Sequence, residues 1–114
     1  MQIKRIYEPA EISDGYRVLV DRPWPRGVKK ETARIDLWLK DVAPSAALRK
    51  WFGHKPEKWK DFSLGYREEL KQNKAVAELI KIIKGHPSRT LLYGAKDEIH
   101  NQTVVLKSFL EARL

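Results

Sequence analysis

The feature that most constrains the fold of this chain is the stretch Tyr16–Gly27, which reads Y-R-V-L-V-D-R-P-W-P-R-G. Its apolar run, Val18–Val20, is too short for a helix and is rich in the β-branched residues that favour a buried strand. Asp21 and Arg22 end this run, and two prolines then bracket Trp24. Because proline fixes its own φ angle and biases the preceding residue toward an extended conformation, we predict a stiff loop directly after a buried strand.

Two further segments have the pattern of strands. Thr90–Ala95 is a second continuous apolar run that ends in charged residues, which is typical of a strand buried on both faces. Ile3–Tyr7 contains charged residues between apolar positions and predicts a short first strand that ends before Pro9. The sequence Ser13–Gly15 predicts a turn before the central strand, Tyr16–Asp21.

Apolar residues at helical spacing occupy most of the remaining chain. They predict a short helix from Glu31 or Thr32 to Lys40, a second from Ser45 as N-cap to Gly53, a third over Glu57–Gln72, a fourth over Ala75–Lys84 with Gly85 as C′ residue, and a last helix with His100 in its first turn. The side chains predicted to be buried on these helices are Ile35, Trp38, Leu39, Leu48, Trp51, Phe52, Trp59, Phe62, Tyr66, Leu70, Val76, Leu79, Ile80, Ile83, Val105, Leu106, Phe109 and Leu110.

The order of these elements, two strands, four helices, a strand and a helix, predicts a small α/β fold. We expect one layered domain, residues 1–114, with a mostly parallel short sheet covered by helices, since a chain of 114 residues suits a single core. There is no signal peptide and no apolar run of about 18 residues, so we expect a cytoplasmic protein with no membrane partner. The absence of cysteine excludes disulfides, thiolate metal sites and cysteine nucleophiles. The three histidines have no metal-binding spacing, so we predict no metal site.

The chain is basic, with 23 lysine and arginine residues against 15 aspartate and glutamate residues and a formal net charge of +8. Such a charge attracts phosphates, nucleic acid or small anions. Many of the lysines are spread over several segments, as is typical of solvated helix faces. A small anionic or phosphorylated ligand and nucleic acid are both candidate partners.

Each of the two buried strands runs into a polar, charged loop that is followed by a helix. If right-handed crossovers make these strands parallel neighbours, both loops lie at the same carboxyl edge of the sheet, where ligands of open α/β sheets bind. The free N–H groups at the start of the last helix would also favour an anion there. The candidate site residues are Asp21, Arg22, Trp24 and Arg26 from the first loop and Lys96, Asp97, His100 and Asn101 from the second.

Several of these residues have two interpretations. Arg22 either binds an anion or forms an ion pair with Asp21 that holds the loop. Trp24 either packs as a lid or offers a stacking surface. His100 is a candidate general acid or base, with a structural or merely exposed histidine as the alternative. His54 follows two aromatic residues and a glycine, and either reaches over the strand edge or interacts with a helix C-terminus.

Four stretches of the chain read V-L-V-D-R-P-W-P-R-G, L-R-K-W-F-G-H, P-E-K-W-x-x-F and L-L-Y-G-A-K-D-x-x-H-N. Together they resemble the DUF488 family, in its short YeaO-like branch, and the resemblance covers the chain from Ile3 to about Leu110. It implies a small bacterial or archaeal cytoplasmic α/β protein and no particular reaction. Other branches carry a C-H-R triplet where this chain has Ile99, His100 and Asn101, so thiol chemistry in those branches does not extend to this chain.

Three functional hypotheses follow. The first is a pocket for a small anionic or phosphorylated ligand, such as a nucleotide, clamped by Arg22 and Arg26. If this pocket is catalytic, His100 or His54 acts as general acid or base. The carboxylate of Asp97 or Asp21 orients this histidine. The second is a nucleic-acid-binding module that uses the basic surface and an exposed tryptophan. The third is a partner-binding or structural domain, and the sequence leaves the cofactor, the reaction and the oligomeric state open.

Overall fold

In the computed structural model, which describes residues 1–114, four strands form one parallel sheet: β1 (Gln2–Arg5), β2 (Tyr16–Leu19), β3 (Leu37–Trp38) and β4 (Arg89–Tyr93). Their order across the sheet is β1-β4-β2-β3. In the register of the sheet, Leu91 of β4 lies opposite Ile3 on one side and Val18 on the other. The two buried strands are therefore parallel neighbours, as the sequence predicts, and their carboxyl ends lie at the same edge.

Five α-helices accompany the sheet: α1 (Lys30–Ala33), α2 (Ala46–Phe52), α3 (Trp59–Lys71), α4 (Lys74–Lys84) and α5 (Gln102–Glu111). Short 3-10 turns lie at Ile12–Asp14, Lys40–Val42 and Pro56–Lys58. The predicted cap of α2 is confirmed, because Ser45 Oγ accepts a hydrogen bond from the Leu48 N–H at 3.1 Å. Asn73 and Asn101 cap α4 and α5 in the same way.

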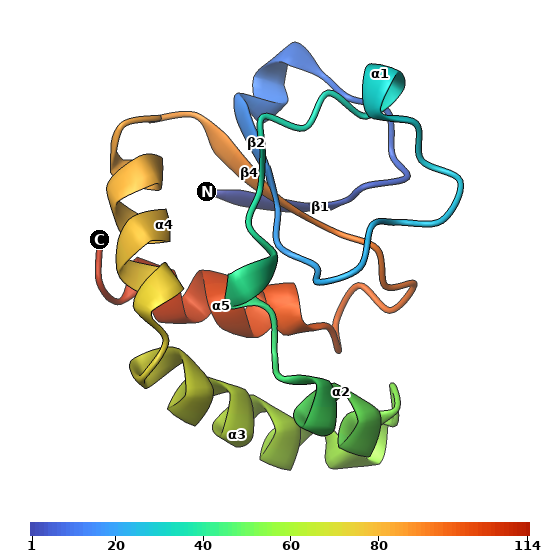
Figure 1. Cartoon of the computed structure of the whole chain (residues 1–114), viewed down its shortest axis with the longest axis vertical. Coiled ribbons are helices and arrows are strands. Elements are labelled where there is room, and N and C mark those ends of the chain that lie inside the picture. Colours follow the sequence, from blue (N-terminus) through green and yellow to red (C-terminus); the bar gives the residue numbers. More distant parts are fainter.

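The two faces of the sheet are covered differently (Figure 1). On one face, Val18, Val20 and Leu91 pack against buried side chains of α3, α4 and α5 in the larger core. On the other face, Leu19 and Leu92 pack in a smaller cluster under the segment that joins β2 to β3; its other members are Ile6, Trp24, Val28, Ala33 and Ile35. The chain thus has a small α/β fold with its large helices on one face of the sheet.

The prediction of one helix from Glu31 or Thr32 to Lys40 is wrong, because the structure has the short helix α1 and then the strand β3 in this segment. The left-handed backbone of Arg34, with φ at 50°, ends α1 after four residues. The chain then extends, and β3 pairs in parallel with Val18 and Leu19. Pairing with the buried strand β2 therefore outweighs the helical spacing of three apolar residues, and Trp38 of β3 is exposed rather than buried.

Three smaller predictions are also corrected. Trp51 of α2 is 45% exposed, because Phe52 takes the buried position and the amino group of Lys58 lies 4.8 Å from the Trp51 ring. Gly85 ends α4 with a right-handed φ of −79°, so the conformational freedom of glycine is not used there. His100 precedes α5 rather than lying in its first turn, because the following residue is the N-cap.

A buried arginine joins three segments near the amino end of β2. Arg17 pairs with Asp14, and its guanidinium also donates to the carbonyls of Ala33 at 3.1 Å and Arg34 at 3.2 Å. Lys4 lies on the same carboxylate, with Nζ 3.1 Å from Oδ1. Each buried charge therefore has an opposite charge and hydrogen bonds, which is the condition under which burial of charge is tolerated.

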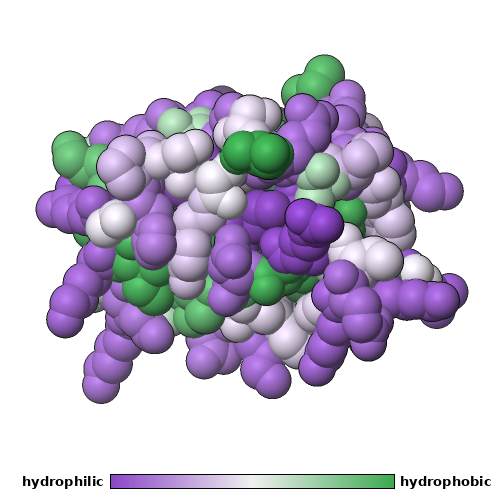
Figure 2. All heavy atoms as spheres, turned by 90° about the horizontal axis from the view of Figure 1, so that it is seen from above, coloured by the Kyte–Doolittle hydropathy of each residue, from purple (hydrophilic) through white to green (hydrophobic).

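The surface is largely hydrophilic. Figure 2 shows a face on which hydrophobic residues form only small, separate groups. The most exposed apolar side chains, Ile12, Leu64 and Ile99, come from different segments of the chain. None of the helices combines the length and the apolar sequence that crossing a membrane requires.

Candidate functional site

A pocket of about 750 Å³ lies at the carboxyl edge of the sheet. Most of its lining comes from the loop after β2, the helix α2 with the residues around it, and the segment from β4 to the start of α5; Tyr7, after β1, and Phe62 of α3 complete it. These parts are far apart in sequence, and Figure 1 shows how the ends of β2 and β4 bring their loops together. The pocket is therefore at the position that the parallel sheet predicts for a ligand.

The structure brings only some of the predicted site residues into this pocket. Its lining includes four residues of the first loop, Asp21, Arg22, Trp24 and Arg26, together with His54 from the segment after α2. The second-loop residues, which do not line it, are Lys96, Asp97, His100 and Asn101.

Asp21 is the only carboxylate in the pocket lining, and it accepts its hydrogen bonds from uncharged donors. Its Oδ2 accepts from the Gly94 N–H at 2.8 Å, and its Oδ1 accepts from Nε2 of Gln102. Burial raises the pKa of the Asp21 carboxyl above its usual value, although both hydrogen bonds act in the opposite direction. The nearby positive charge of Arg49 also favours the carboxylate form.

None of the three arginines in the lining, Arg22, Arg26 and Arg49, has a carboxylate partner. Arg22 donates one long hydrogen bond, from Nη2 to the Ala43 carbonyl at 3.5 Å, and does not form the ion pair with Asp21 that the sequence allows. The Nε atoms of Arg22 and Arg49 are buried and have no hydrogen-bond partner. A buried N–H without an acceptor is unfavourable, so each of these groups has an unused donor.

His54 enters the pocket lining through an unusual backbone turn. Gly53 ends α2 in the left-handed conformation, and His54 is also left-handed, with φ at 56°. The imidazole is exposed, with its centroid 6.1 Å from that of Phe52. This histidine therefore lies just after the C-terminus of α2 and also belongs to the pocket lining, a position that suits both of its interpretations from the sequence.

His100 and Asp97 form a local pair outside the pocket lining. His100 Nδ1 lies 2.9 Å from Asp97 Oδ2, and the edge of Trp59 packs against the His100 ring at a centroid distance of 5.4 Å. Hydrogen bonds from the backbone N–H groups of His100 and Ile99 lower the pKa of Asp97 to about 2. No group of three or more acidic or imidazole side chains could hold a metal ion.

Asn101 uses both ends of its side chain within the protein. Its Oδ1 accepts from the N–H groups of Thr103 at 3.0 Å and Val104 at 3.3 Å, and its Nδ2 donates to the Asp97 carbonyl at 2.9 Å. The residue is only 1% exposed. These contacts give Asn101 a structural role as the N-cap of α5.

The Trp24 side chain is held by a hydrogen bond and by packing. Its Nε1 donates to the Val28 carbonyl at 2.8 Å, and its ring meets the edge of Trp38 at a centroid distance of 5.4 Å. Trp24 also packs on the smaller core cluster. The side chain therefore combines packing with a place in the pocket wall.

Three polar residues of the lining are absent from the candidates that the sequence supplies: Arg49, Lys50 and Gln102. The first two precede Trp51 in the motif L-R-K-W-F-G-H, in which the sequence marks only the histidine as a candidate site residue. Gln102 directly follows the polar motif after β4. Only the packing of α2 and α5 on neighbouring elements brings these side chains to the edge of the sheet.

Comparison with known proteins gives a family and relatives of similar length. The family model DUF488-N3i, described as "Inactive DUF488-N3 subclade", matches residues 1–114. The uncharacterised protein YeaO of Escherichia coli is 42% identical over 112 residues, which cover 98% of this chain and 97% of YeaO. An uncharacterised protein of Mycobacterium tuberculosis is 40% identical over 113 residues, which cover 99% of this chain and 95% of that protein. No solved structure matches the chain.

Proposed function

The chain belongs to the DUF488 family, in the clade described as the inactive DUF488-N3 subclade, and on this premise we propose that its pocket binds a small phosphorylated anion without turning it over. The observation that carries the proposal is the pair of buried Nε atoms, on Arg22 and Arg49, that have no acceptor in the protein. Guanidinium groups are suited to phosphate because their donors match two oxygens at once.

The charge of the pocket supports an anion with more than one negative charge. Its lining contains four cationic side chains, those of Arg22, Arg26, Arg49 and Lys50, against the one carboxylate of Asp21. With the histidine neutral, four positive charges and one negative charge leave a net charge of +3. A phosphate ester balances more of this charge than a monocarboxylate does.

The side chains in the lining support binding rather than turnover. No serine, threonine or cysteine is among them, so the common hydroxyl and thiol nucleophiles are missing. His54 is the only histidine in the lining. We assign it to binding, as a polar side chain in the pocket wall beside the arginines.

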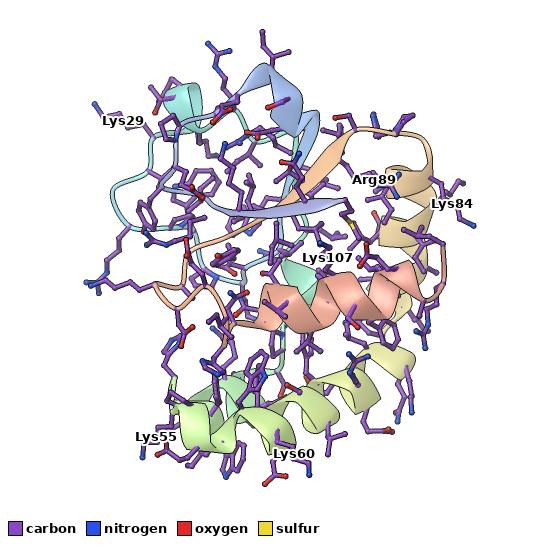
Figure 3. The ribbon with its side chains drawn as sticks, turned by 180° about the vertical axis from the view of Figure 1, so that it is seen from behind. Lys29, Lys55, Lys60, Lys84, Arg89 and Lys107 are labelled. Carbon is purple, nitrogen blue, oxygen red and sulfur yellow. The ribbon has the colours of Figure 1, made fainter.

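The distribution of the other cations favours a pocket over a nucleic-acid surface. Figure 3 shows that Lys29, Lys60 and Lys84 come from different segments and lie at separate borders of the molecule. A protein that follows a nucleic-acid backbone gathers its cations along one groove or face. We therefore place the nucleic-acid hypothesis second and include it in the test.

The test is calorimetric titration of inorganic phosphate into the wild-type protein and the variants Arg49→Ala and Lys60→Ala. Both variants lose one positive charge, but Lys60 is exposed on α3 and is not part of the pocket. We expect Arg49→Ala to weaken phosphate binding by at least about 10-fold, because a charge-assisted hydrogen bond is lost. Lys60→Ala should bind like the wild type.

Two results would contradict the proposal. The first is equal phosphate affinity in all three proteins. The second is binding of a short single-stranded RNA that is as sensitive to Lys60→Ala as to Arg49→Ala and disappears at moderate salt, since this behaviour indicates a dispersed basic surface.

A further inference from the structure

The pocket is much larger than a phosphate ion and has an aromatic wall. Its volume of about 750 Å³ lies in the range of sites for small organic molecules. Tyr7 and Trp24 line it from the side of β1 and the proline loop, together with Pro23 and Pro25. This wall therefore offers ring surfaces to the part of a ligand beyond the phosphate.

Both rings are held in place by their polar atoms. Tyr7 OH donates to the Arg26 carbonyl at 3.0 Å, and the Arg5 guanidinium carbon lies 5.1 Å from the centroid of the Tyr7 ring. Trp24 is fixed by its hydrogen bond to the Val28 carbonyl. Tyr7 nevertheless remains 47% exposed, so much of its surface is available to a ligand.

A single glycine separates this aromatic wall from the charged part of the pocket. The Gly94 N–H binds the Asp21 carboxylate, and a methyl group on Gly94 would lie 3.1 Å from Asp21 Oδ2 and 3.9 Å from Cε2 of Tyr7. The Tyr7 ring and the Asp21 carboxylate are therefore close, and Asp21 in turn lies near the positive charge of Arg49. One small molecule can contact the ring and the guanidinium at the same time.

We infer that the ligand is a phosphate monoester that carries a flat aromatic ring, as a nucleoside monophosphate does. Its phosphate accepts hydrogen bonds from Arg22 and Arg49, and its ring lies against Tyr7 and Trp24. This inference rests on the proposed function, because it names the class of compound that the phosphate site takes. Stacking on an aromatic side chain adds affinity for any planar base without requiring specific hydrogen bonds.

The test compares adenosine 5′-monophosphate with ribose 5-phosphate, which has the same phosphate and sugar but no base. Calorimetric titrations use the wild-type protein, Tyr7→Phe and Tyr7→Leu. We expect the wild type and Tyr7→Phe to bind the nucleotide at least about 5-fold more tightly than ribose 5-phosphate, because both keep the ring. Tyr7→Leu should lose this difference and keep its affinity for ribose 5-phosphate.

The outcomes separate this inference from the proposed function. Equal affinities for the two compounds in the wild type would overturn the aromatic ligand and leave the phosphate site standing. An equal loss for both compounds in Tyr7→Leu would also overturn it, since the ring would then act on the phosphate site itself. Failure of the wild type to bind either compound would overturn both proposals.

Discussion

Replacement of Asn101 by alanine tests which of two roles its side chain has. The sequence suggests that Asn101 binds a ligand, whereas the structure shows that it caps α5. The Asn101 side chain caps α5 through the N–H groups of Thr103 and Val104 and donates to the Asp97 carbonyl. All of these groups remain in the Asn101→Ala variant, but their partner is gone. We therefore expect Asn101→Ala to destabilise the fold and leave the pocket unchanged.

The size of the effect follows from the contacts. Loss of an N-cap costs about 1 kcal/mol, and loss of the hydrogen bond to the Asp97 carbonyl costs about 1 kcal/mol more. The free energy of unfolding should therefore fall by about 2 kcal/mol, which lowers the melting temperature of a chain this size by about 8 °C. Asn101→Asp keeps the acceptor for the helix N–H groups and loses only the donor, so it should lose about half as much.

Urea unfolding followed by circular dichroism measures the free energies, and phosphate titration measures the pocket. An Asn101→Ala protein with unchanged unfolding free energy would refute the capping role. A folded, equally stable variant that no longer binds phosphate would instead assign Asn101 to the ligand.

Three further predictions concern stability. Gly15→Ala should lower the free energy of unfolding in urea by about 3 kcal/mol or more, because Gly15 has φ at 66° and the new methyl group would clash with the Ser88 carbonyl oxygen; a loss below about 1 kcal/mol would contradict the close approach. Arg17→Ala should lower the free energy of unfolding by about 3 to 5 kcal/mol in the same assay, since it leaves the Asp14 carboxylate buried with only Lys4 as counter-charge. An unchanged free energy of unfolding would contradict a stabilising role for the buried pair. Asp97 has its pKa lowered from 3.8 to about 2 chiefly by the backbone N–H of His100, so the stability it contributes is present above pH 3.8 and is lost as the pH falls through about 2. Asp97→Asn should accordingly melt below the wild type at neutral pH, and this difference should become small near pH 2 and vanish below it; a constant difference across this range would argue against the shift.

Much of the architecture is predictable because it is encoded locally. The strand β2 is marked by β-branched residues and an abrupt change to charge at Asp21, and the Ser45 cap is marked by a hydroxyl before a helical stripe. Arg22 and Arg26 follow the strand directly, so their place at its carboxyl edge also follows from local sequence.

The remaining features depend on tertiary contacts. The strand β3 has two residues, too few to show an alternating pattern, and it exists because β2 offers a pairing edge. Arg49 reaches the pocket through the packing of α2 on α3, and no spacing along the chain encodes that approach. The polar side chain of Asn101 suits either a cap or a ligand, and only the position of the nearby N–H groups decides between them.

The most direct test of the phosphate site observes the arginine Nε–H groups themselves. Nuclear magnetic resonance of the side-chain Nε–H signals during titration with inorganic phosphate follows Arg22, Arg49 and Arg89 in one sample. All three have a buried Nε without a hydrogen-bond partner, but Arg89 is not part of the pocket and serves as an internal control. We predict that the Arg22 and Arg49 signals shift together and saturate while the Arg89 signal stays in place. Unchanged Arg22 and Arg49 signals, or equal shifts of all three, would contradict a phosphate site at this edge of the sheet.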